Sequence, residues 1–265
     1  MTKTKGVIDP QTKNPDEMFI GWAPAPAVDR RFLLGALPTG LLLGGGASWA
    51  IASNLDDPGA GEWLTGATHK VTGALITEPY PMVRIVDEGA PFGVRTVLVV
   101  AQGKCTSSLS LSEYADKPVT ASGALIQRKD RQMLEVPLFL EKWLEPQRMD
   151  LPQSVVSPEP VSLGAATFAG TIMDSKCFFG VMRPGRGKTH KACAALCIRG
   201  GIPPSFWVRG ENGREYVMLM TDTNGGPMSM DILPLVADPV TAKGEVVRVG
   251  DILQFRADAS AYKRI

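Results

Sequence analysis

Three of the four cysteines in this sequence, and one of its two histidines, fall within one short segment: Cys177, His190, Cys193 and Cys197. Thiolate sulfur and imidazole nitrogen are ligands for soft metal ions, and thiolates also form or exchange disulfides. The segment therefore predicts a centre of sulfur chemistry, and three interpretations of it are open.

The first interpretation is a metal site made by all four side chains, because a Cys₃His set suits tetrahedral Zn²⁺ and thiolates also favour Cu(I). Zinc or copper is then the expected cofactor. The second is a structural disulfide from Cys177 to Cys193 or Cys197, which an extracytoplasmic location would favour. The third is a reactive thiol site, with Cys193 and Cys197 as the candidate redox thiols.

Basic residues surround the cysteines, and Asp174 is the only acid between residues 174 and 200. A positive field lowers the pKa of a thiol and raises its reactivity, although lysines and arginines of a loop are commonly just solvated. The patch contains Lys176, Arg183, Arg186, Lys188, Lys191 and Arg199.

A helix is expected to position the histidine and two of the three cysteines. Residues 188–199 have helical composition, and Gly200-Gly201 supplies a stop. His190, Cys193 and Cys197 are spaced i, i+3, i+7, so they share one stripe of that helix. Cys177 is expected on or just after a strand, with the loop 183–188 folding it back over the stripe.

The segment interrupts the second copy of a duplicated module. Residues 117–123 (KPVTASG) match residues 238–244 (DPVTAKG), and flanking landmarks also pair. Gly73 and Arg95 are separated by 22 positions, but the corresponding Gly170 and Arg214 are separated by 44. The second copy therefore carries an insertion, residues 174–204, and this insertion holds the cysteines and the histidine.

Short alternating apolar runs with glycines at their bends predict a mainly β fold: an N-terminal transmembrane helix followed by two tandem small antiparallel β-barrels. The strand rhythm resembles the OB-fold, and a pair of small β-sandwiches is the alternative. The predicted modules are residues 63–143 and 163–265, and a Pro-rich linker, residues 144–162, joins them.

Residues 32–55 contain no charged side chain. A helix of this length is about 36 Å long and can cross a hydrocarbon core of about 30 Å. Arg30 and Arg31 before the span predict that the lead, residues 1–31, is cytoplasmic and the β modules are external. A signal peptide cleaved near Ala50-Ile-Ala52 and a buried core helix are the alternatives.

The pattern D-x-K-C at residues 174–177, followed by H-x-x-C-A-x-x-C-I-x-G-G-I-P-P at residues 190–204, resembles a signature of poorly characterised membrane-associated bacterial proteins. The resemblance covers about thirty residues. It implies that the insertion acts as a unit, and it implies no reaction. Together with the predicted orientation of the span, we expect a bacterial inner-membrane protein whose β modules are periplasmic.

Other classes of function fit the sequence poorly. A net charge of +1 argues against nucleic-acid binding, and no motif supports a hydrolase triad. His69 and Cys105 are expected to be structural. We therefore expect a non-enzymatic accessory subunit or assembly factor of a membrane complex, with a protein partner and with the insertion handling a metal or an interaction. A periplasmic thiol-disulfide or copper-transfer protein and a structural subunit with a stapled insertion are the alternatives.

Overall fold

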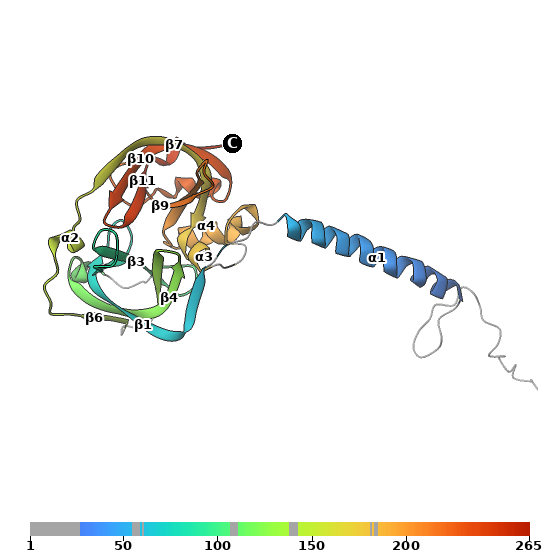
Figure 1. Ribbon diagram of the computed structural model, residues 1–265, viewed down its shortest axis with the longest axis horizontal. Helices are drawn as coiled ribbons and strands as arrows, with labels where there is room; N and C mark the ends of the chain where they lie inside the picture. Colours follow the sequence, from blue (N-terminus) through green and yellow to red (C-terminus); the bar gives the residue numbers. More distant parts are fainter. Residues whose placement is uncertain are drawn as a thin grey trace, which may run out of the picture. The chain divides into compact units, whose positions relative to one another are not determined.

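Figure 1 shows a computed structural model of the chain, which describes residues 27–54, 59, 61–106, 111–137, 143–180, 182 and 185–265. The chain divides into two units between residues 57 and 58. The first unit contains helix α1, Ala27–Ser53. This helix is long and apolar enough to span a membrane, and its large apolar side chains, such as Phe32, Leu34 and Leu41, are exposed. Most of the predicted cytoplasmic lead, residues 1–31, lies outside the described residues, and so does Arg183 of the predicted basic patch.

The second unit contains two closed five-stranded barrels in tandem, which confirms the predicted OB-like modules and excludes the β-sandwiches. Each barrel has a short additional strand, and the described part of the first half also contains two small helical elements. The elements are β1 Glu62–Ile76, β2 Met82–Val86, β3 Val94–Ala101, η1 Ser112–Tyr114, β4 Pro118–Arg128, β5 Arg131–Val136, β6 Leu144–Pro146 and α2 Gln153–Val156. β6 and α2 both lie in the segment predicted as the linker.

The second barrel follows the same order. Its elements are β7 Val161–Asp174, α3 Ser175–Phe179, η3 Lys188–His190, α4 Lys191–Arg199, β8 Pro204–Arg209, β9 Glu215–Thr221, η4 Met230–Leu235, β10 Pro239–Val249, β11 Ile252–Arg256, η5 Ala259–Ala261 and β12 Tyr262–Arg264. The three helical elements α3, η3 and α4 fall between β7 and β8, where the sequence repeat predicts the insertion.

Equivalent strands pair in the same way in the two barrels. The first strand pairs with the fourth in both (β1 with β4, β7 with β10), and the third pairs in parallel with the fifth (β3 with β5, β9 with β11). Equivalent glycines also make equivalent approaches. A Cβ on Gly73 would lie 2.0 Å from the Arg84 carbonyl oxygen, and one on Gly170 would lie 2.3 Å from that of Trp207. The repeated glycines therefore let neighbouring strands cross closely where the first strand bends.

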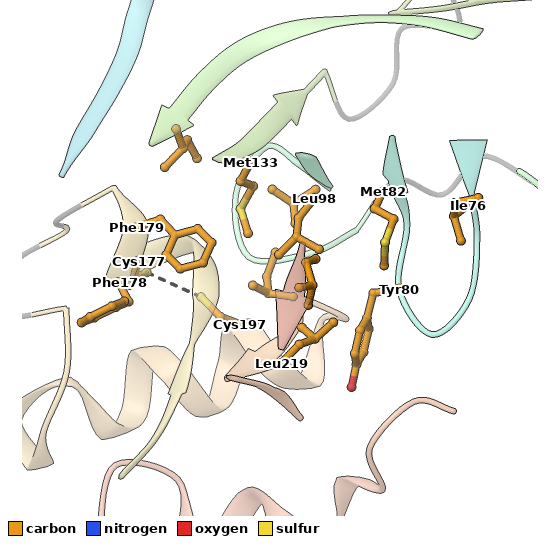
Figure 2. Close-up of a cluster of buried hydrophobic side chains, with 14 of the residues drawn as sticks. Ile76, Tyr80, Met82, Leu98, Met133, Cys177, Phe178, Phe179, Cys197 and Leu219 are labelled. Atoms are coloured by element: carbon orange, nitrogen blue, oxygen red, sulfur yellow. Dashed lines mark hydrogen bonds between the residues drawn. The ribbon is translucent and has the colours of Figure 1, made fainter. Parts of the chain in front are cut away.

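Three clusters of buried apolar side chains stabilise this unit. One fills each barrel, and the third lies where the barrels meet. Figure 2 shows the third cluster, in which Tyr80 and Leu98 of the first barrel face Leu219 of the second, with Phe179 of α3 beside them. The barrels therefore share a core, and the insertion contributes to it.

Tyr80 locks the two barrels together through its hydroxyl group. The hydroxyl donates to the Met220 carbonyl oxygen and accepts from the Met228 N–H, both at 2.9 Å. Burial raises the pKa of Tyr80 to about 12, so the hydroxyl stays protonated at neutral pH.

We expect Tyr80→Phe to lower the free energy of unfolding by about 2 kcal/mol, because it leaves a buried carbonyl and a buried N–H without a partner. Urea unfolding of the full chain in detergent measures this loss. Tyr216→Phe removes the hydroxyl of an exposed tyrosine and serves as the control. Equal stability of the two variants would contradict the role given to Tyr80.

Candidate metal centre

Asp174 organises the site from the last position of β7. Its Oδ1 accepts the Cys177 N–H at 2.8 Å and so caps α3, while its Oδ2 lies 3.1 Å from His190 Nε2. Asp174 is fully buried, and His190 is 4% exposed. A single carboxylate therefore fixes both the helical turn that carries Cys177 and the ring that precedes α4.

The three sulfurs of the insertion converge. Cys177 Sγ lies 3.9 Å from Cys193 Sγ and 4.0 Å from Cys197 Sγ. Ligand atoms of Cys177, His190 and Cys193 lie within 4.8 Å of one another, and those of Asp174, Cys177 and Cys197 do so as well. In Figure 2 the dashed line joins Cys177 of α3 to Cys197 of α4 at the margin of the shared core. These residues could hold a metal ion.

Cys177, His190 and Cys193 are thus brought together, and Cys197 joins Cys177 in a second group with Asp174. One feature differs from the expected helix. The segment 188–190 forms a 3₁₀ turn, and α4 begins at Lys191, so His190 is the residue that caps α4 rather than part of its stripe. His190 reaches the cysteines because Asp174 holds its ring. Since Asp174 occupies Nε2, Nδ1 is the nitrogen left to bind a metal.

All four cysteines carry free thiols, so no disulfide is formed in the structure. The sulfurs are about 2 Å further apart than a bonded pair, whose S–S distance is about 2.05 Å. The structural disulfide from Cys177 to Cys193 or Cys197 stays a prediction. Cys105 lies apart from the cluster, and its thiol donates to the Gln102 carbonyl oxygen at 3.4 Å.

Cys177 and Cys197 share a proton unequally. The hydrogen bond to Cys197, together with burial, raises the pKa of Cys177 well above its usual range. The same hydrogen bond lowers the pKa of Cys197. Cys177 is therefore the thiol that donates, and Cys197 is the one that ionises more readily.

Among the described residues, the cation closest to the thiols comes from the first barrel, in the loop after β3. Lys104 Nζ lies 2.6 Å from Cys193 Sγ and 3.9 Å from Cys197 Sγ. The hydrogen bond to Cys193 raises the pKa of Lys104. Sequence reasoning missed Lys104, because it precedes Cys193 by 89 positions and no local pattern links the two.

The predicted basic patch has other contacts. Lys176 is buried and forms an ion pair with Glu135, Lys191 pairs with Asp238, and Arg186 stacks on Trp207. Lys188 and Arg199 are exposed. The described members of the patch thus hold the insertion to the barrels or face solvent, and Lys104 supplies the charge beside the thiols.

A cavity of about 290 Å³ leads to the cluster. Cys177, Cys197, Met182 and Lys104 line it together with Trp63 and Lys176. The Met182 thioether lies 3.6 Å from Cys177 Sγ, and Cys193 is half-buried beside it. A small ion can therefore reach the sulfurs from solvent.

Comparison of the chain with known protein families, curated proteins and solved structures finds no match. The chemistry of the site is therefore argued from its geometry. His69, the other histidine, lies outside the cluster on β1, and its Nε2 is buried with no hydrogen-bond partner among the described residues.

Proposed function

We propose that the protein is a membrane-anchored binder of a thiophilic metal ion. One observation carries the proposal: the Cys177 sulfur lies 3.9 and 4.0 Å from those of Cys193 and Cys197. Sulfurs bound to one tetrahedral ion at about 2.3 Å are about 3.8 Å apart. The spacing of the cluster thus fits sulfurs that share one ion.

Two ions suit this set of ligands. Three thiolates with His190 Nδ1 would supply the four ligands that Zn²⁺ prefers, and the carboxylate behind His190 is the usual support of such a ligand. Thiolates with the Met182 thioether instead favour Cu(I). Lys104 balances part of the negative charge of the thiolates in either case.

The anchor is α1, a helix of membrane-spanning length. Arg30 and Arg31 at its start support a cytoplasmic N-terminus, and the barrels would then lie in the periplasm of a bacterium. Free thiols are oxidised in such a compartment, and a bound metal protects them. In an extracytoplasmic location the cluster would therefore either hold a metal ion or oxidise to a disulfide.

We infer that the protein is an accessory subunit or assembly factor of a membrane complex and that the metal site serves this role. The cavity lined by Cys177 and Cys197 leaves one side of the cluster open, so a partner protein could receive or deliver the ion there. Copurification in mild detergent tests the partner, and a chain recovered alone would contradict it.

Metal analysis tests the site itself. The detergent-solubilised full chain, reduced and loaded anaerobically with Zn²⁺ or Cu(I), is expected to retain about one ion per chain after desalting. Cys193→Ser should lose most of that ion, because one sulfur ligand is gone. Cys105→Ser removes a thiol outside the cluster and should retain the ion. Equal retention by the two variants, or none by the wild type, would remove the proposal.

A thiol-disulfide exchange protein is the second candidate, favoured by the short contact of Lys104 with Cys193. The Cys193 thiolate would attack a substrate disulfide and expel one substrate thiolate. Cys177 or Cys197 would then attack the mixed disulfide, form an internal disulfide and release the second substrate thiolate. If the chain retains no metal after desalting but its reduced form reduces the disulfide of a model protein, this candidate is favoured.

A further inference from the structure

A second cavity, of about 440 Å³, opens between two β-hairpins, one from each barrel. The β4–β5 turn contributes residues 128–131, and the β8–β9 hairpin contributes Arg209 and residues 213–217. Phe178 and Phe179 of α3 line it as well. The cavity has the size of a site for a small organic molecule, and it is separate from the cavity that reaches the sulfurs.

The charge of this cavity is unbalanced. Five cationic side chains and two carboxylates, Asp130 and Glu215, line it, and even without Arg128, which makes further contacts, the excess is two positive charges. Each carboxylate is 3.9 Å from its nearest cation, Lys129 for Glu215 and Arg131 for Asp130. Such long, solvated ion pairs neutralise little charge. The cations are Arg128, Lys129, Arg131, Arg209 and Arg214.

Two of the arginines are held in place. Arg128 is 7% exposed, donates to the Phe178 carbonyl oxygen at 3.0 Å, and stacks over the Phe178 ring. Arg131 donates to the Asp251 carbonyl oxygen of the second barrel at 3.2 Å. Both side chains are therefore fixed in the wall of the cavity and lose little conformational entropy on binding, while Arg209 and Arg214 are exposed on the opposite hairpin.

We propose that this cavity binds a small organic anion carrying two or more phosphate or carboxylate groups. Guanidinium groups on two facing walls can each take one anionic group through paired hydrogen bonds. Phe179, Val217 and Leu253 supply an apolar surface for the carbon skeleton between those groups. The ligand bridges the hairpins of the two barrels and relieves the repulsion between their cations.

Isothermal titration of the detergent-solubilised full chain with pyrophosphate and with citrate, at constant ionic strength, tests the proposal. Pyrophosphate represents a phosphate ligand and citrate a carboxylate ligand, and saturable binding of either supports the site. Arg209→Gln and Arg214→Gln are each expected to weaken that binding about tenfold, because each removes a charge-assisted contact. Arg148→Gln removes an exposed arginine outside the cavity and should leave binding unchanged.

Absence of binding by both anions at millimolar concentration would overturn the proposal. Equal affinity of the Arg209, Arg214 and Arg148 variants would overturn it too, because the anion would then bind elsewhere. Both hairpin arginines are exposed, so these variants should unfold at the same urea concentration as the wild type. The proposal does not depend on the metal site, since a metal-free Cys193→Ser chain should bind the anions equally well.

Discussion

Replacing Lys176 with methionine is expected to lower the free energy of unfolding by about 3–5 kcal/mol. Lys176 Nζ lies 2.6 Å from Glu135 Oε1 and donates to the carbonyl oxygens of Ala101 and Gly103 at 2.7 and 2.8 Å. The lysine is 2% exposed. Methionine fills a similar volume but leaves the buried Glu135 carboxylate with one remaining side-chain donor among the described residues, Trp63 Nε1 at 3.2 Å. Urea unfolding of the full chain measures the loss.

A second substitution separates the buried charge from the rest of the effect. In Lys176→Met with Glu135→Gln, the glutamine oxygen can still accept from Trp63 and no unpaired charge is buried, so a large part of the stability should return. Lys188→Met changes an exposed lysine of the same insertion and should cost little. A loss below about 1 kcal/mol for Lys176→Met would show that the ion pair does not hold the insertion to the first barrel.

The two barrels could be predicted from the sequence because the residues that determine their strands and bends are close together in the chain and occur twice. The matched segments before Gly123 and Gly244 form equivalent strands, β4 and β10, and each glycine allows the backbone of the neighbouring strand to approach. The insertion was also predictable, since it lengthens one copy only. Helical composition and a glycine stop predict α4 to within a few residues, as helix ends allow.

The surroundings of the cysteines depend on how the barrels dock, and a single sequence does not encode that arrangement locally. Lys104 and Glu135 belong to the first barrel, and neither has a motif that links it to the insertion. Lys176 illustrates the difficulty, because a lysine in a basic run is expected in solvent but this one is buried. Asp174 differs from these residues because its role has a local signal: an aspartate directly before a helical turn is a capping residue as well as a charge.

Asp174→Asn is expected to weaken metal binding by about 10–100-fold while preserving the fold. Asparagine caps a helix about as well as aspartate, so its oxygen can still accept the Cys177 N–H. Its amide group would instead donate to His190 Nε2, which places the imidazole proton on Nδ1. The nitrogen that should bind the ion would then carry a proton, and the ion would keep only its sulfur ligands.

Competition with a chromophoric chelator measures the affinity, and Asp150→Asn, at an exposed position, is the matched control. His190→Ala should weaken binding by a similar factor, and the double variant should be little weaker than either single one, because both changes remove the same ligand. Unchanged affinity in Asp174→Asn, with Zn²⁺ still bound, would mean that His190 does not ligate through Nδ1. If the substitution weakens the affinity for Zn²⁺ but not for Cu(I), then Cu(I) is bound by the sulfurs alone. Soft ligands satisfy Cu(I), which does not need the imidazole.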